Sequence, residues 1–274
     1  MSLRVTEHQA EQKMCPCCQQ PQTASFPAHV EQRIQYGSGV QAFLVYLHQT
    51  QLIPYARTVE VMRDLFGHTI SEGTLSNMIR RAAEKLDPLV EDIRKTILSS
   101  PVIHADETGM DVLPKRQWVH VYSTAEETYY AIHPKRGRAA IDDIGFLSAF
   151  TGTAVHDAWQ AYFPYVNCTH ALCNAHILRE LTYLHEQEKQ EWAGLLHQLL
   201  LEMKKQKELY QKADLMPPPK VLAQLTAWYD TRVAEGCEKN PVAYSEETLK
   251  KKGSKKQSPA RNMLDRLLLH WEKI

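Results

Sequence analysis

The amino-acid sequence predicts an α/β fold: a mixed five-stranded sheet with flanking helices, preceded by a small helical domain and followed by a helical insertion. Three observations predict it. Residues 38–98 carry apolar residues at helical spacing, residues 99–188 contain short apolar, aromatic-rich segments separated by polar breaks, and residues 189–274 return to long helical patterns. Strands that alternate with helices favour an α/β domain in the middle of the chain.

The composition is that of an ordinary globular protein, with 43% hydrophobic and 23% charged residues. Lys plus Arg equals Asp plus Glu at 32 each, so any contact with nucleic acid has to come from local patches rather than from bulk charge. No apolar run reaches the roughly 18–20 residues that span a bilayer, and the N-terminus lacks a signal-peptide core. We therefore expect a cytoplasmic protein with no membrane partner.

Residues 1–37 are polar and contain the stretch "CPCCQQPQ". Cys15 and Cys18 have the spacing of half a zinc knuckle, whose tetrahedral site needs four nitrogen or sulfur ligands. A second pair is missing, so Zn²⁺ bound by these two cysteines and free cysteines in a flexible segment both stay open. In a chain without a secretion signal, clustered cysteines favour metal or free thiols over disulfides.

Residues 38–98 are predicted to form three helices arranged like a helix-turn-helix. Apolar residues repeat at helical spacing at Val40, Phe43, Leu44 and Leu47, then at Val59, Met62 and Phe66, and then on an inner face at Leu75, Met78, Ile79, Ala82 and Leu86. Gly67 closes the second helix, and Ser71 caps the third. Such a bundle can bind DNA through Arg80 and Arg81, or these arginines can form a solvated surface.

The next segments predict the sheet. "VIHADETGMDV", "RQWVHVYST" and "TYYAIHPK" indicate a strand and two meander partners, "RAAIDDIGFLSAF" a helix, "GTAVHDAWQAYF" a short strand, and "HALCN" a strand leading into the helix "AHILRELTYLHE". Val102, Ile103 and Ala105 predict that the first strand is buried on both faces. We expect that strand to end where the chain reaches Asp106 and Glu107.

Asp106 and Asp157 each follow an apolar, strand-like run. If the two strands are neighbours, both carboxylates emerge at the same edge of the sheet. Two carboxylates with a third nearby can hold two divalent cations about 3.5–4 Å apart, which is an arrangement for phosphodiester chemistry. Oxygen ligands favour Mg²⁺ or Mn²⁺. Acids at strand ends without any metal are the alternative interpretation.

Residues 189–274 predict a long polar helix to about Asp214, a break at "PPP", a further helix, a break from Gly236 to Pro259, and a last helix. The apolar stripe of that last helix comprises Leu264, Leu267, Leu268 and Trp271. The stretch "KKKGSKKQSPAR" has no acid, and its cations are Lys250, Lys251, Lys252, Lys255, Lys256 and Arg261. We predict a mobile loop that follows DNA phosphates, with a merely solvated linker as the alternative.

The segments "SPVIHADETGM", "YYAIHPKRG", "GTAVHDAW" and "HALCNAHILREL", together with "IQYG", "LIPYARTVEVMRDLFGHTISEGTL" and "ARNMLDRLL", occur in the order found in the Insertion Sequence 66 family of bacterial transposases. The resemblance runs from about Cys15 to the final residue. It implies a ribonuclease H-like catalytic core of the DDE type that acts on DNA ends with two metal ions. Its first two acids match Asp106 and Asp157, and Glu107 is then expected to point to the other side of the pleat.

Two departures from the family pattern shape the expected function. The family's third acid lies in an Asn-Asn-x-x-Glu-Arg motif after the helical insertion, and no such motif precedes Ile274. Glu180 lies on the helix after the fifth strand-like segment, where the resemblance places it outside the catalytic trio. The family also usually carries two cysteine pairs upstream, and here only the Cys15–Cys18 pair is found. We therefore expect a transposase fragment with an incomplete core.

His170, Cys173 and His176 in "HALCNAHILREL" resemble soft metal ligands when taken alone. The alternative, which we favour, is that they shape the junction between strand and helix next to the site.

The expected domains are a partial zinc-knuckle-like segment at 1–37, a helical and possibly DNA-binding domain at 38–98, an incomplete ribonuclease H-like core at 99–188, and a helical insertion with a basic loop at 189–274. The resemblance implies a DNA strand transferase that acts on the element's terminal repeats and on target DNA, as a homo-oligomer and with accessory transposition proteins. One alternative is a catalytically inactive remnant that binds DNA or a partner. Another is a structure-specific nuclease of the same fold.

Overall fold

The computed structural model describes residues 2–112, 114–242 and 257–274. The chain divides into two compact units, Met1–Glu91 and Asp92–Ile274, which are described one at a time. Within the described ranges, no helix is long and apolar enough to cross a membrane.

The first unit begins with a short antiparallel hairpin of β1 (Gln12–Met14) and β2 (Pro21–Thr23). Cys15 opens the turn between these strands. Its backbone N–H donates to the Gln20 carbonyl at 2.9 Å, and its own carbonyl accepts from the Gln19 N–H at 2.9 Å. The cysteine-rich stretch is therefore the tip of a hairpin.

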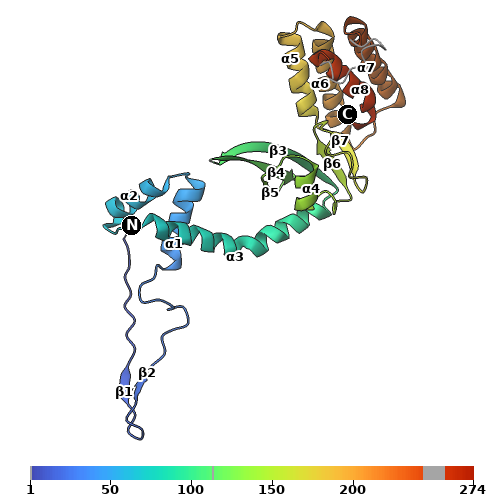
Figure 1. Cartoon of the computed structure of the whole chain (residues 1–274). Coiled ribbons are helices and arrows are strands. Elements are labelled where there is room, and N and C mark those ends of the chain that lie inside the picture. The colour runs from blue at the N-terminus through green and yellow to red at the C-terminus, as the bar shows by residue number, and fades with distance from the viewer. Residues whose placement is uncertain (1, 113, 243–256) are drawn as a thin grey trace. The chain divides into compact units, whose positions relative to one another are not determined.

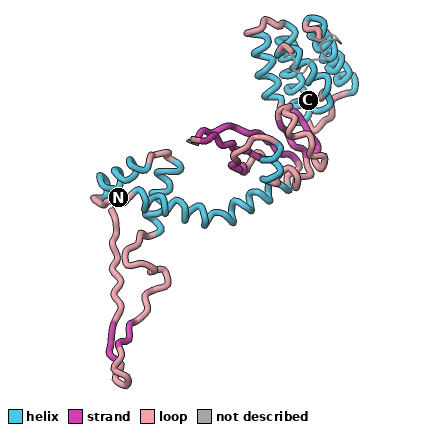
Figure 2. Tube along the Cα trace, in the orientation of Figure 1, coloured by secondary structure: helices cyan, strands magenta, loops and turns pink. Residues whose placement is uncertain are grey.

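Three helices and one π-helical turn follow: α1 (Ser38–Val45), η1 (Tyr46–Thr50), α2 (Tyr55–Phe66) and α3 (Glu72–Ser99) (Figure 2). Gly67 ends α2 in the left-handed region at φ +63°, and the Ser71 hydroxyl accepts the Thr74 N–H at 3.0 Å, which caps α3. Leu44, Met62, Ile70, Leu75 and Met78 form the core of this unit. The inner face predicted for α3 is wrong at Leu86, which is 50% exposed.

The second unit contains a five-stranded mixed sheet in the order β5-β4-β3-β6-β7 (Figure 1). The strands are β3 (Val102–Val112), β4 (Lys115–Ser123), β5 (Thr128–His133), β6 (Thr153–His156) and β7 (Thr169–Leu172). β3, β4 and β5 form an antiparallel meander, and β6 and β7 add in parallel beside β3. This order and these directions are those of a ribonuclease H-like fold, so the predicted fold class is confirmed.

One face of the sheet is covered and the other is open. Ile103 and Ala105 of β3 pack with Tyr122 of β4, with Ile141 of α4 (Arg138–Ile144) and with Phe146 just beyond that helix. On the opposite face Val102 is 46% exposed. The expectation that β3 is buried on both faces is therefore wrong.

β3 also does not end at Asp106. Its parallel pairing with β6 stops at His104, opposite Val155, but its antiparallel pairing with β4 continues as far as Val112, opposite Lys115. The hairpin ladder supplies backbone hydrogen bonds that the apolar pattern of β3 does not reveal. Asp106 therefore lies within a strand.

In the described residues after the sheet, four helices share one core: α5 (Asn174–Glu186), α6 (Glu191–Lys212), α7 (Pro219–Lys239) and α8 (Pro259–Leu269), with a short 3₁₀ turn, η2 (Trp271–Lys273), at the end. Their core includes Leu181, Leu184, Trp192, Leu196, Val233, Met263, Leu264 and Leu267. The stripe predicted for the last helix is wrong at Leu268 and Trp271, which are 52% and 55% exposed.

We predict that Gly152→Ala destabilises the second unit. A Cβ atom at Gly152 would lie 2.6 Å from the Pro101 carbonyl oxygen and 2.6 Å from Cζ of Phe150, at the point where β6 begins to pair with β3. Overpacking of this kind typically costs about 1–3 kcal/mol. Urea unfolding measures the loss. Gly137→Ala is the matched control, because no atom lies within 4 Å of its added Cβ; an equal effect of the two substitutions would contradict the prediction.

Candidate functional site

The parallel register of β3 and β6 sets the positions of the two predicted acids. The last residue pair is His104 opposite Val155; Asp106 comes two residues further along β3, and Asp157 comes two residues further along the chain, directly after β6 ends at His156. Continuing this register by two residues puts Asp157, just beyond the end of β6, level with Asp106 of the neighbouring strand β3. β3, which carries Asp106, and β6, which Asp157 directly follows, are adjacent, as predicted.

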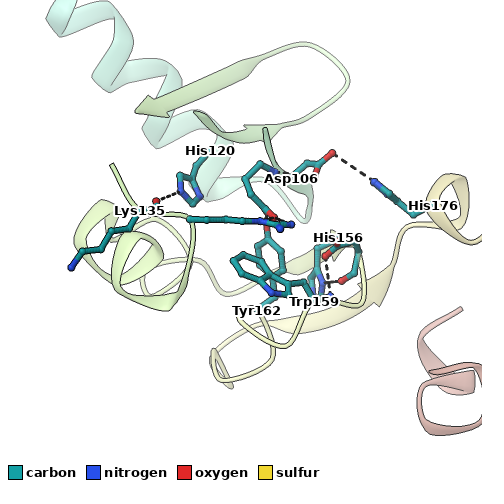
Figure 3. A network of polar contacts seen from close by, with 10 residues as sticks. Asp106, His120, Lys135, His156, Trp159, Tyr162 and His176 are labelled. Atoms are coloured by element: carbon teal, nitrogen blue, oxygen red, sulfur yellow. Dashed lines mark hydrogen bonds and ion pairs between the residues drawn. The ribbon is translucent and has the colours of Figure 1, made fainter. Parts of the chain in front are cut away.

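Asp106 lies on the open face, and its side chain is 58% exposed. Its carboxylate oxygen Oδ2 is 3.9 Å from Nε2 of His176, which comes from the first turn of α5 (Figure 3). Nδ1 of His176 is buried and has no hydrogen-bond partner among the described residues. His176 of the Cys-x-x-His motif is therefore directed toward Asp106.

Local hydrogen bonds hold the backbone and side chain of Asp157. The Trp159 N–H donates to Oδ1 of Asp157 at 2.9 Å, which is an Asx-turn, and Nδ1 of His156 bonds to the Asp157 carbonyl. Nε2 of His156 in turn contacts Nδ1 of His170 at 2.8 Å. Burial lowers the pKa of His156 to about 4, so this histidine is neutral at pH 7 and serves as a structural support for Asp157.

A pocket beside Asp157 brings together residues of α5 and α8. It is lined by Asp157, Ala158, Leu172, Cys173, His176, Ile177, Glu180, Met263, Arg266 and Leu267. Within it, Nη1 of Arg266 donates to Oε1 of Glu180 at 3.0 Å, and Nη2 donates to Oε2. The carboxylate of Glu180 is thus engaged by a guanidinium, while the side chain of Asp106 is 58% exposed on the open face of the sheet.

The described part of the chain contains no group of three or more His, Cys, Asp or Glu side chains arranged to hold a metal ion. Two carboxylates on neighbouring strands still suit one hard divalent cation, which takes its remaining ligands from water. A second cation needs a further acidic ligand. Carboxylate oxygens are donors of the type that Mg²⁺ or Mn²⁺ takes, and the described residues bring no group of three acidic ligands together for two ions.

The sequence did not reveal the network on the covered face, directly behind Asp106. The side chain of Glu107 is 1% exposed, and its Oε1 accepts from Nε and Nη2 of Arg136 at 2.8 and 2.6 Å. The Tyr162 hydroxyl donates to the other oxygen, Oε2. Burial raises the pKa of Glu107, the hydrogen bonds from Tyr162 and Arg136 oppose that rise, and the nearby charge of Asp157 adds to it.

Arg136 extends this network to the segment after Asp157. Its guanidinium lies 4.3 Å from the ring centroid of Trp159 and 5.1 Å from that of Trp118. Next to it, Nε2 of His120 contacts the Lys135 carbonyl at 3.4 Å (Figure 3). Arg136 and Tyr162 therefore tie β3 to the segment that carries Asp157. The alternation of side chains along β3 predicts only that Glu107 points away from Asp106.

The other predicted sites lie apart from this edge. Cys15 and Cys18 sit at the hairpin tip, where the backbone N–H groups of Cys18 and then Cys17 lower the pKa of the Cys15 thiol. All the cysteines are free, and no further ligand joins this pair among the described residues.

The predicted DNA-binding cations differ in their surroundings. Arg80 pairs with Glu84 at 3.0 Å, and Arg81 is exposed on the same helix. Arg261 is not in a loop: it lies in α8 and pairs with Asp265 at 2.7 Å. The lysines Lys250, Lys251, Lys252, Lys255 and Lys256 lie outside the described residues.

The profile of the family described as "Transposase IS66 family" matches residues 33–274. No curated protein matches the chain. Among solved structures, one similar chain belongs to a cryo-electron microscopy structure of the simian T-cell lymphotropic virus intasome in complex with PP2A regulatory subunit B56 gamma. The match covers 53% of this chain and 59% of that chain at 12% sequence identity, and its TM-score of 0.24 is too low to support a conclusion.

We predict that Arg136→Met destabilises the second unit by about 1–3 kcal/mol at pH 7, because it leaves a buried carboxylate short of its donors. The loss should shrink as the pH falls toward 5. Without the guanidinium the pKa of Glu107 rises further, and an acid whose folded-state pKa is raised contributes stability below its unfolded pKa and loses it as the pH rises through its folded pKa. Urea unfolding at several pH values measures this dependence.

The matched control for this experiment is Arg138→Met, because Arg138 makes only a 3.6 Å contact with Asp142 and its side chain is 65% exposed. A loss for Arg136→Met that stays constant from pH 5 to pH 8 would contradict the assigned role of Glu107. In a background that carries Glu107→Gln, the loss of unfolding free energy caused by Arg136→Met should not change with pH.

Proposed function

We propose that Asp106 and Asp157 are the first two metal-binding carboxylates of a DNA strand transferase. The reason is that the chain belongs to the IS66 family of transposases. The observation that supports this most directly is the β3–β6 register, whose continuation by two residues would bring Asp106 level with Asp157 just beyond β6. The substrate class is DNA ends, namely the terminal repeats of an insertion sequence and a target duplex.

The two acids have separate supports, and we propose that these supports keep both carboxylates in place for metal and substrate. Bound Mg²⁺ or Mn²⁺ would supply Lewis-acid activation of a water or a 3′-hydroxyl and neutralise charge on the leaving oxygen. Asp157 is oriented by the Trp159 N–H, and Asp106 is anchored by the β3–β4 ladder. Correct placement matters, because a shift of about 1 Å in a reacting group can cost on the order of 100-fold in rate.

The second candidate function is a DNA- or partner-binding protein without catalytic activity. It is favoured by one observation: Glu180, the acid on α5 in the pocket beside Asp157, is bound by Arg266 rather than directed to the edge of the sheet. A two-metal reaction needs a further acidic ligand. The two candidates differ in what they predict for metal-dependent joining of DNA ends.

We predict that Asp106→Asn and Asp157→Asn each weaken Mn²⁺ binding at least tenfold, measured by isothermal titration calorimetry, because each removes a charged ligand of one shared ion. The double substitution should cost little more than either single one. Asp111→Asn is the matched control, since Asp111 lies on the same strand and its side chain is 82% exposed. Equal Mn²⁺ affinity in the unsubstituted protein and in all four variants would contradict the proposed site.

We also predict that Glu180→Gln leaves Mn²⁺ affinity unchanged, because its carboxylate is already neutralised by Arg266.

A strand-transfer assay with labelled terminal-repeat ends, run in parallel, separates the candidate functions. Joining that requires Mg²⁺ or Mn²⁺ and is lost in Asp106→Asn supports the transferase. Cleavage without joining indicates a nuclease, and DNA binding without either reaction indicates the non-catalytic protein. Metal-dependent joining that is abolished by Glu180→Gln would show that Glu180 is itself a metal ligand.

A further inference from the structure

The hairpin formed by α6 and α7 extends beyond the core of the helical layer. Leu200 of α6 and Leu225 of α7 are buried, and none of the described residues between them is buried. Leu200 is the last buried residue of α6, and the helix continues from it to Lys212, which is about 18 Å at about 1.5 Å per residue. The far end of this hairpin therefore projects from the core.

Large apolar side chains gather at the far end of the hairpin, although no core lies there. Leu215 and Met216 lie in the turn between the two helices and are 62% and 85% exposed. Leu209, in the last turn of α6, and Leu222, in the first turn of α7, are 52% and 48% exposed. Single exposed apolar residues are common on protein surfaces, but a cluster of them marks a surface that a partner covers. We call these four residues the apolar tip.

The turn that carries the apolar tip has little conformational freedom. Asp214 lies in the left-handed region at φ +53°, and its N–H donates to the Gln211 carbonyl at 3.1 Å. The Leu215 N–H donates to the Tyr210 carbonyl at 2.9 Å, which completes a Schellman motif at the end of α6. Prolines at 217–219, whose rings fix φ, then lead directly into α7. The turn is therefore preorganised, which lowers the conformational entropy that it loses on binding.

Lysines flank the apolar tip on both helices. Lys207 and Lys212 of α6 and Lys220 of α7 are exposed, and in the described part of the chain none of the three has an ion-pair partner. The one acid in the turn is Asp214. An apolar surface bordered by cations complements duplex DNA, which offers stacked bases between two rows of phosphates.

We propose that the α6–α7 turn is a wedge for duplex DNA. Leu215 and Met216 enter between two stacked base pairs, and Lys212 and Lys220 bind the phosphates on either side of that step. Leucine and methionine are among the side chains that proteins insert at a base step, which unstacks the step and kinks the duplex by about 20–90°. The wedge rests on the proposed function because it takes DNA as the substrate class. It adds a distortion of the duplex that the two aspartates do not themselves require.

Binding of the full chain to dye-labelled DNA in EDTA tests the wedge without any metal-dependent reaction. Each duplex carries a terminal repeat, with a donor dye at one end and an acceptor dye at the other. Energy transfer should rise on binding, because a kink shortens the distance between the two ends. In a series of duplexes with one unpaired step moved along the DNA, one position should lower the dissociation constant at least about tenfold, because the cost of unstacking is then already met.

Leu215→Ser combined with Met216→Ser should abolish the rise in energy transfer and should bind paired and unpaired duplexes with dissociation constants within about twofold of each other. Both side chains are exposed, so the urea midpoint should not change. The matched control is Leu268→Ser combined with Leu269→Ser, which removes two adjacent leucines that are 52% and 69% exposed on α8 and should alter neither readout. If the first double variant is destabilised, Met216→Ser alone decides.

Lys212→Gln combined with Lys220→Gln should reduce the slope of log affinity against log salt by about two, because each lost phosphate contact removes about 0.9 from that slope. The preference for the unpaired step should remain. An unchanged slope would overturn the assignment of these two lysines.

The wedge fails if the protein binds DNA without a rise in energy transfer, if the variant with two serines keeps the preference for an unpaired step, or if no DNA is bound. The Mn²⁺ titrations and the strand-transfer assay judge the proposed metal site independently. Failure of the wedge is therefore distinguishable from failure of the proposed function.

Discussion

The candidate site depends on a short parallel ladder between β3 and β6. Only three residue pairs form it, from Val102 opposite Thr153 to His104 opposite Val155. A slip of one residue would turn one of the two acids to the covered face, because side chains alternate along a strand. Close packing at Gly152 and the antiparallel partner β4 on the other side of β3 both restrict such a slip. The proposed metal site therefore depends first on the backbone register between β3 and β6 and only then on side-chain contacts.

The ion pair on the covered face holds the same region from the other side. Glu107 is adjacent in sequence to Asp106, and its partners Arg136 and Tyr162 reach it from the end of the meander and from the segment after Asp157. A buried pair of this kind adds little net stability, but removal of one partner is costly because the remaining charge is left unmatched. The pair of Glu107 and Arg136 therefore fixes the position of β3 relative to the segment after Asp157 and contributes little to the free energy of folding.

The sequence predicted the strand order of the meander, the two acid-bearing strands and the helical layer, because period-two and helical patterns are local signals. It was wrong where a tertiary contact decided the outcome. Asp106 lies within β3 because pairing with β4 extends that strand. Leu86 is exposed because α3 continues past the residues that form the helical core. The partner of Glu107 could not be predicted, since no local pattern specifies which of the many cations in a chain meets a buried carboxylate.

We propose that Asp106 and Asp157 share one divalent cation. A crystal structure of the protein grown with Mn²⁺, with the ion located by its anomalous scattering, tests this most directly. We expect an anomalous peak about 2.0–2.2 Å from one carboxylate oxygen of each aspartate, with water completing the coordination. A peak bound to only one of the two, a peak at Glu180, or carboxylates on opposite faces of the sheet would contradict it.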